Sequence, residues 1–273
     1  MPTDSLLDQL LETVEAGEAV ALVTVVKASG VFSESLGRRA LIWLDRPPVG
    51  DLDLDRLDPR ALADARQSLA NRQTELLTYQ QAGSQVELFI EVQRRPPTLL
   101  IVGAGHVALP LAQLGKLLEF NVVVLDDRPR YANPERFPMA DRVLAQPFRK
   151  TLREWPIDYD TYIVLVTRGH SHDVECLMEV IDSPARYIGM IGSKRRVKGV
   201  FELLEREQGL APAKLDRVYS PIGLDIGAET PTEIAVAVMA EIINLYRRGR
   251  AVPLSDALRA NRRLPLHPGR SNG

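Results

Sequence analysis

The residue types most able to do chemistry gather in one short stretch, TRGHSHD, which spans Thr167 to Asp173. It holds two of the four histidines, His170 and His172, beside a carboxylate, and such groups serve as metal ligands and as general acids or bases. Two imidazoles at i and i+2 across a turn share no fixed face, and no HExxH or facial-triad spacing is present. The stretch alone does not make a metal site, and one with His106 as third ligand stays open.

A second cluster lies in the sequence VGAGHVA, where Gly103, Gly105 and Ala108 form the pattern G-x-G-x-x-A. This pattern makes a tight turn and leaves the backbone bare, so that a pyrophosphate can approach the N-terminus of the following helix. Asp126 ends the next strand, 23 residues after Gly103, where a ribose-binding carboxylate is expected. The pattern predicts a Rossmann fold. Its unusual member is His106, which sits where a phosphate would lie.

The elements that would position these residues alternate regularly from residue 98 onward. Each apolar strand pattern leads into a helix, which predicts an α/β fold: a Rossmann-like parallel sheet with helices on both faces. The earlier residues instead predict a small α+β N-terminal domain, with helices at 5–17 and 58–80 and strands at 19–29, 39–45 and 85–92. The expected boundaries are 1–92 for this domain, 93–97 for a proline-rich linker, 98–250 for the Rossmann-like domain and 251–273 for a loosely held tail.

The carboxyl ends of parallel strands line one crevice, so polar residues that follow different strands converge there. We expect this crevice to bind a ligand through its strand-end residues. The residues assigned to it are Gly103, Gly105, His106, Asp126, Asp127, Arg128, Thr167, His170, Asp173, Gly192, Ser193, Lys194, Arg195, Asp225 and Glu233.

Several of these residues also have a purely structural interpretation. Asp173 fits a first-turn carboxylate favoured by the helix dipole, and Glu233 fits a capping box that begins at Thr230. The basic residues Lys194, Arg195 and Arg196, in the run SKRR, are harder to explain locally because the dipole repels positive charge at a helix start. An anionic group of a ligand would resolve this conflict.

The bulk composition excludes several classes of protein. A net charge of −2 excludes the basic excess that binding to nucleic acid or an anionic membrane requires. No apolar run approaches the roughly 18 residues of a membrane span, and we expect no signal peptide. The single cysteine, Cys176, excludes an intrachain disulfide and suits a reducing, cytoplasmic setting. Its apolar neighbours predict a packed thiol rather than a nucleophile.

Residues 98–245 resemble the XdhC/CoxI family through five motifs in order: LLIVGAGHVALPLAQL, VLDDRPRYANPERFP, LVTRGHSHD, YIGMIGSKRR and PIGLDIGAETPTEIAVAVMAEII. Members of this family are accessory proteins for xanthine dehydrogenase and related molybdenum hydroxylases. The resemblance implies that the chain binds molybdenum cofactor (molybdopterin) as cargo and delivers it to a molybdenum hydroxylase apo-enzyme, with a cysteine desulfurase as a further candidate partner. His106, His170 and Asp173 would then contact the dithiolene or molybdenum end.

The N-terminal domain resembles the family only in outline. Where the family carries a G-S-T-P-R-like loop and a C-G-G motif, this chain reads SGVFSESLGRR and QAGSQVE, without the cysteine. Two other functions therefore stay open: an NAD(P)-dependent oxidoreductase, in which Asp126 would favour NAD, and a nucleotide-binding regulatory protein. The apolar last helix, EIAVAVMAEIINLY, packs either internally or across a homodimer.

Overall fold

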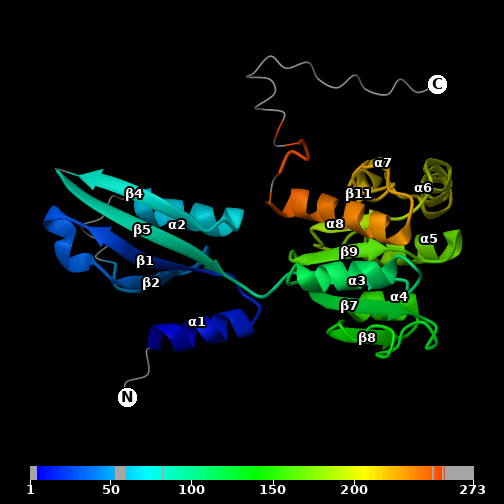
Figure 1. Cartoon of the computed structure of the whole chain (residues 1–273), viewed down its shortest axis with the longest axis horizontal. Coiled ribbons are helices and arrows are strands. Elements are labelled where there is room, and N and C mark those ends of the chain that lie inside the picture. Colours follow the sequence, from blue (N-terminus) through cyan, green and yellow to red (C-terminus); the bar gives the residue numbers. More distant parts are fainter. Residues whose placement is uncertain (1–4, 53–59, 82, 248, 254, 256–273) are drawn as a thin grey trace, which may run out of the picture. The chain divides into compact units, whose positions relative to one another are not determined.

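The computed structural model describes residues 5–52, 60–81, 83–247, 249–253 and 255. The chain divides into two compact units, Met1–Arg95 and Pro96–Gly273, and the division falls within the predicted linker. Each unit has its own sheet and its own core (Figure 1). Of the predicted tail, only residues 251–253 and 255 are described.

The first unit is built on a five-stranded antiparallel sheet in the order β3-β2-β1-β5-β4. Its elements are α1 (Ser5–Glu15), β1 (Val20–Ala28), the 3-10 helix η1 (Gly30–Ser35), β2 (Arg39–Ile42), β3 (Val49–Gly50), α2 (Arg60–Asn71), β4 (Glu75–Gln81) and β5 (Ser84–Gln93). Alternate residues of β1 serve opposite faces: Val23 and Val25 pack with α2, whereas Val20 and Leu22 pack with α1. The predicted α+β domain is confirmed.

The helix predicted at 58–80 is wrong beyond residue 71. The helix α2 ends at Asn71, and Arg72 adopts a φ of 57°, in the left-handed region where helices commonly terminate. Glu75 to Gln81 form β4 instead, paired along its length with β5. The run ELLTYQQ has no strong local preference, so the neighbouring strand decides its structure by supplying backbone partners. Residues 58 and 59 lie outside the described residues.

The second unit is a six-stranded parallel sheet in the order β11-β10-β9-β6-β7-β8. Its elements are β6 (Thr98–Val102), α3 (Ala108–Leu117), β7 (Asn121–Asp126), β8 (Arg142–Ala145), α4 (Phe148–Glu154), β9 (Thr161–Leu165), α5 (His170–Val180), β10 (Tyr187–Met190), α6 (Lys194–Gln208), α7 (Pro212–Leu215), β11 (Val218–Tyr219) and α8 (Pro231–Arg247). Counted within this unit, the strands follow the doubly wound order 3-2-1-4-5-6 of dinucleotide-binding domains. The predicted Rossmann-like fold is confirmed.

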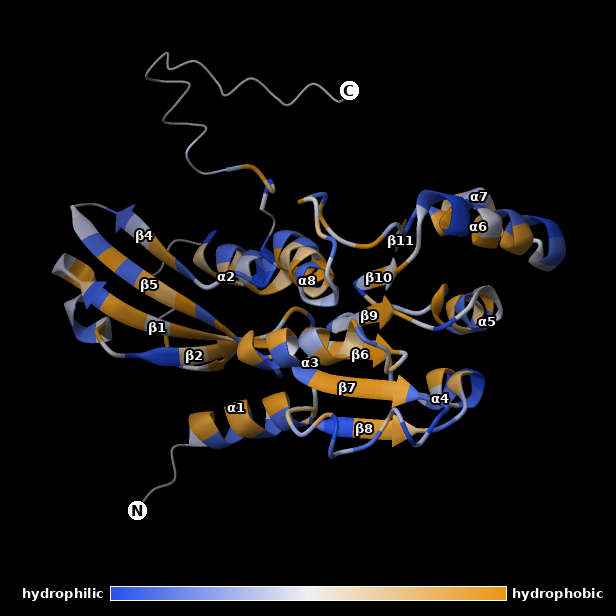
Figure 2. Ribbon diagram, turned by 45° about the vertical axis from the view of Figure 1, so that its right-hand side comes forward, coloured by the Kyte–Doolittle hydropathy of each residue, from blue (hydrophilic) through white to orange (hydrophobic). Residues whose placement is uncertain are grey.

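Helices cover both faces of this sheet because alternate strand residues point in opposite directions. Leu99 and Ile101 pack with α3 and α8, whereas Leu100 and Val102 pack with α4, α5 and α6. Figure 2 shows β7 and β9 as hydrophobic along most of their length, as expected for parallel strands buried on both faces. Within the described part of the chain, no helix has both the length and the apolar character needed to cross a membrane.

Strand order reverses between β6 and β9, and the first glycine of the loop after β6 is packed into this junction. Gly103 has a φ of +107°, and a Cβ there would lie 2.5 Å from the carbonyl oxygen of Val166, just beyond β9. A Cβ on Gly105 would meet nothing within 4 Å. The fold therefore requires a glycine at position 103, whereas Gly105 faces open space.

Replacing these two glycines separates the two roles. Gly103→Ala should lower the free energy of unfolding of the second unit by about 2 kcal/mol or more, because it adds a backbone clash to an unfavourable φ. Gly105→Ala, the matched control, should change it by less than about 0.5 kcal/mol. Urea unfolding followed by Trp155 fluorescence in a Trp43→Phe background measures both values. Equal stability of the two variants would contradict the assignment.

Candidate functional site

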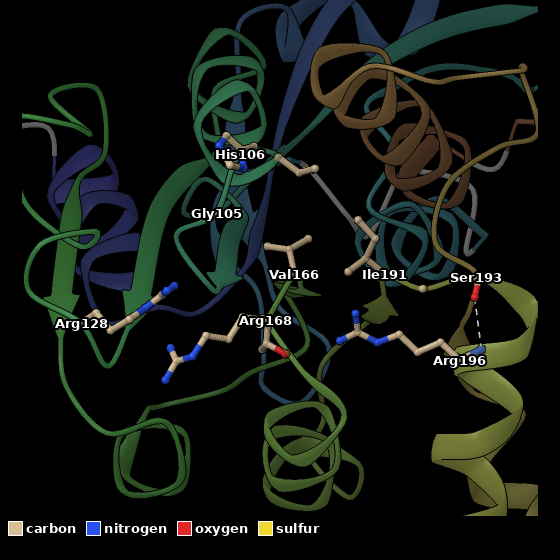
Figure 3. Close-up of a pocket in the computed structure, with 11 residues that line it drawn as sticks. Gly105, His106, Arg128, Val166, Arg168, Ile191, Ser193 and Arg196 are labelled. Carbon is tan, nitrogen blue, oxygen red and sulfur yellow. Dashed lines mark hydrogen bonds between the residues drawn. The ribbon is translucent and has the colours of Figure 1, made fainter.

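A pocket of about 510 Å³ lies at the carboxyl ends of the strands, where strand order reverses. Such crevices bind ligands in doubly wound sheets, and the volume is within the usual range of small-molecule sites. Six predicted site residues line the pocket (Figure 3): Gly105, His106, Arg128, Thr167, Gly192 and Ser193. Five residues not assigned from the sequence line it as well: Val107, Val166, Arg168, Ile191 and Arg196.

The glycine loop is held by charged side chains from the end of β7 and from the segment after it. Asp126 accepts a hydrogen bond from the backbone N–H of Ala104 at 2.8 Å, and Arg136 donates to the carbonyl oxygens of Ala104 and Gly105. These contacts fix the loop in front of α3, whose first N–H groups have no intrahelical partners. The partial positive charge of this helix end favours an anion. His106 lines the pocket from the same loop.

Asp126 is committed to contacts within the protein. Its carboxylate is 1% exposed and accepts four hydrogen bonds, one from Ala104 and three from the backbone and guanidinium N–H groups of Arg128. Burial by itself would raise the pKa of Asp126, but the hydrogen bonds from Arg128 and Ala104 lower it to about 2. Four hydrogen bonds use all the lone pairs of a carboxylate. No acceptor is left for a ribose hydroxyl in this geometry.

Two arginines form one wall of the pocket, and each is held by an acid at the end of β7. Arg128 stacks on Tyr131, with its guanidinium carbon 3.9 Å from the ring centre, and pairs with Asp126 at 2.8 Å. Arg168, which follows β9, holds Asp127 through two hydrogen bonds of 2.7 and 3.0 Å. Asp127 thus orients Arg168 without lining the pocket itself.

A third arginine reaches the pocket from α6 and is anchored by a buried acid. Asp173 is 0% exposed, and its Oδ2 accepts hydrogen bonds from Nε of Arg196, at 3.0 Å, and from Nη2. The hydroxyl of Thr167 donates to the other carboxylate oxygen. Ser193 caps the same helix by accepting from the N–H of Arg196 at 3.3 Å. Asp173 is therefore more than a first-turn carboxylate, because it sets the position of Arg196.

Four predicted site residues lie away from the pocket. Lys194 and Arg195 are exposed at the start of α6, and Asp225 is exposed in the loop before α8. Glu233 and Thr230 form the capping box of α8: Glu233 accepts from the N–H of Thr230 at 2.9 Å, and the Thr230 hydroxyl accepts from the N–H of Glu233. The hydrogen bond from Thr230 lowers the pKa of the Glu233 carboxyl. The structural interpretation of Glu233 accounts for its contacts.

The remaining histidines and the cysteine form no second reactive cluster among the described side chains. His170 is the first residue of α5, but its side chain lies outside what the structure describes. His172 packs against Phe148, with ring centres 5.3 Å apart, and does not line the pocket. Cys176 is fully buried, and burial raises the pKa of its thiol, as expected for a packed thiol. No three described His, Cys, Asp or Glu side chains are placed to hold a metal ion.

Two pocket arginines are not among the assigned site residues: Arg196 belongs to the run SKRR, whose charge at a helix start already favoured an anion, whereas Arg168 was not singled out. Arg196 shares a helical stripe with Val200 and Leu204, at i+4 and i+8, and both are fully buried. This periodicity separates Arg196 from its exposed neighbours and was available in the sequence. Arg168 has no such signal, because only the turn after β9 brings it to Asp127.

Comparison with known proteins gives one consistent result. Residues 99–242 match the model of the XdhC Rossmann domain, and residues 13–80 match that of the XdhC and CoxI family. The chain is 31% identical to the uncharacterized protein YqeB of Escherichia coli over 75% of its own length and 40% of that protein. It is 35% identical to a probable xanthine dehydrogenase subunit of Bacillus subtilis over 59% of its own length and 46% of that protein.

A solved structure extends this similarity to nearly the whole chain. The crystal structure of a xanthine dehydrogenase from Bacillus halodurans has a TM-score of 0.66 and 25% identity, over 95% of this chain and 69% of that one. The chain spans less than half the length of the two curated relatives it matches.

The Asp126 carboxylate should make stability depend on pH. Its pKa is lowered from 3.8 to about 2 in the folded state, so its contribution is present above pH 3.8 and is lost as the pH falls towards 2. The shift corresponds to about 2 kcal/mol. Asp126→Asn should lower the free energy of unfolding by about this amount at pH 7 and by much less at pH 2.5, measured by urea unfolding. Asp225→Asn should have no effect, and a loss for Asp126→Asn that does not depend on pH would contradict the prediction.

Proposed function

Because the chain belongs to the XdhC and CoxI family, we propose that it is an accessory protein of a xanthine dehydrogenase-type molybdenum hydroxylase. In this proposal the Rossmann pocket holds molybdenum cofactor as cargo, and the chain helps to insert it into the apo-enzyme. A cysteine desulfurase is a further proposed partner, as the source of sulfur for the bound cofactor.

The observation that carries this proposal is the character of the pocket lining. Three guanidinium groups and the bare start of α3 present hydrogen-bond donors, and none of the lining residues has a carboxyl group. Molybdopterin is an anionic pterin with a phosphate, so most of the groups it would offer to this lining are acceptors. The residues therefore fit this class of ligand.

Each part of the lining suits a part of such a cargo. The N–H groups at the start of α3, together with Arg128, would hold the phosphate. Val166 and Ile191 offer apolar contact to a flat ring. Asp126 and Asp173 would act from behind the lining by keeping their arginines oriented. The chain's own contribution in this proposal is to bind, orient and shield the cargo.

The competing nicotinamide hypothesis lacks its main specific contact. The carboxylate that would bind the ribose, Asp126, has all its acceptor capacity engaged by Ala104 and Arg128. The same objection applies to a regulatory protein that binds an NAD-like nucleotide. These facts favour a phosphorylated pterin over a dinucleotide.

Recovery of the bound small molecule tests the proposal. We expect the protein, purified from a molybdate-replete host, to release a pterin that mass spectrometry identifies. Gly105→Ala should reduce the pterin per chain at least about tenfold, because its methyl group would occupy the space where the ligand approaches the loop.

Gly199→Ala is the matched control for this experiment. Its Cβ also meets nothing within 4 Å, but it lies in α6 and does not line the pocket, so it should leave the pterin content unchanged. Release of a dinucleotide would support the oxidoreductase hypothesis instead. Release of no small molecule from the wild-type protein would contradict cargo binding.

A further inference from the structure

The three arginines of the pocket form two separate groups. Arg128 and Arg168 belong together, because each contacts both acids at the end of β7: Arg128 lies 2.8 Å from Asp126 and 3.8 Å from Asp127, and Arg168 lies 2.7 Å from Asp127 and 3.8 Å from Asp126. This pair is joined to the glycine loop through the hydrogen bond between Asp126 and Ala104. The group is therefore linked to the loop that leads into α3.

Arg196 stands apart from this group. It enters from α6, on the other side of the pocket from Arg128 (Figure 3), and its acid is Asp173 rather than Asp126 or Asp127. Its Nε and Nη2 are engaged by Asp173, whereas Nη1 has no acceptor among the described residues. Ser193 lines the pocket beside it and uses its oxygen as an acceptor, so its hydroxyl hydrogen stays free to donate.

Arg196 is held by a buried carboxylate that is itself hydrogen-bonded. Asp173 is fully buried, and a buried carboxylate is costly unless it is paired and hydrogen-bonded. Arg196 supplies the pair and Thr167 supplies a further hydrogen bond. A buried ion pair commonly stabilises a fold no more than well-packed apolar side chains of similar volume would. What the arrangement adds is a guanidinium with a fixed direction at the pocket.

Apolar side chains also line the pocket that these two groups share. Val166 follows β9 and Ile191 follows β10, the strands whose turns carry Arg168 and Ser193 respectively. A ligand that spans the pocket would therefore place one anionic group near Arg128 and Arg168 and another near Arg196. The uncharged part between them would contact these apolar side chains.

We propose that the pocket contains two anion subsites and selects ligands that carry two separated anionic groups. The first subsite consists of the start of α3 with Arg128 and Arg168, and the second consists of Arg196 and Ser193. Thr167 and Asp173 are positioning residues for the second subsite. The inference rests on the proposed ligand pocket, but it does not depend on which cargo the pocket carries.

A homologous series of simple probes tests this inference in the full chain. Alkane-α,ω-bisphosphonates with three to eight carbons would be compared with butylphosphonate by isothermal titration calorimetry. If both subsites are engaged at once, one chain length should bind at least about tenfold more tightly than the monophosphonate, since the second contact is intramolecular. The measured quantity is the ratio of the two affinities, which a general folding defect does not alter.

Variants of the second subsite should remove this gain selectively. Arg196→Gln should bring the ratio close to one while leaving the affinity for butylphosphonate within about twofold, because the first subsite is intact. Asp173→Asn should lower the ratio as well, through a loosely held Arg196. Arg206→Gln, an exposed arginine in the last turn of the same helix, is the control and should change neither value.

Three outcomes would overturn the two-subsite arrangement: a ratio near one at every chain length, an equal loss of both affinities in Arg196→Gln, or no binding of either probe. The pterin measurement described above is independent of this test. A high ratio without recovered pterin would contradict pterin binding but support the two subsites. Recovered pterin with a ratio near one would support pterin binding but contradict the two subsites.

Discussion

The carboxylate of Asp126 joins three parts of the Rossmann unit that lie next to the pocket. It ends β7, it accepts the N–H of Ala104 in the glycine loop, and it binds the guanidinium of Arg128. Because it is buried, these hydrogen bonds form in a medium of low polarity and are stronger than they would be in water. The loop is consequently held open in front of α3, with Arg128 beside it.

The same physical device is repeated across the site. Behind each pocket arginine lies an aspartate: Asp126 behind Arg128, Asp127 behind Arg168, and Asp173 behind Arg196. Formal charge nearly cancels within these pairs, so the pocket would recognise an anion through oriented N–H donors rather than through excess positive charge. This agrees with a chain whose net charge is −2. Lys194 and Arg195 are exposed and do not line the pocket, so Arg196 is the member of the run SKRR that brings a guanidinium to it.

Much of the architecture could be predicted from the chain because the patterns involved are local. Apolar strands followed by glycine or a polar turn and then a helix predict a parallel sheet, and its carboxyl edge collects the strand-end residues. The prediction failed for Glu75 to Gln80, where the choice between helix and strand depended on β5. The capping box that the sequence predicted for Glu233 agrees with its hydrogen bonds to Thr230. A local motif was sufficient for Glu233, whereas a partner elsewhere in the chain decided the structure of the strand.

The sequence by itself determined the fold class, the position of the pocket at the carboxyl ends of the strands, and six of its lining residues, because strand periodicity and the glycine pattern act over short distances. Tertiary structure alone decided which charges face that pocket. Arg168 meets Asp127 across 41 residues, and Arg196 meets Asp173 across 23. Such pairs form only after separate strands have been brought side by side, since the energy of an ion pair depends on distance and burial rather than on order along the chain.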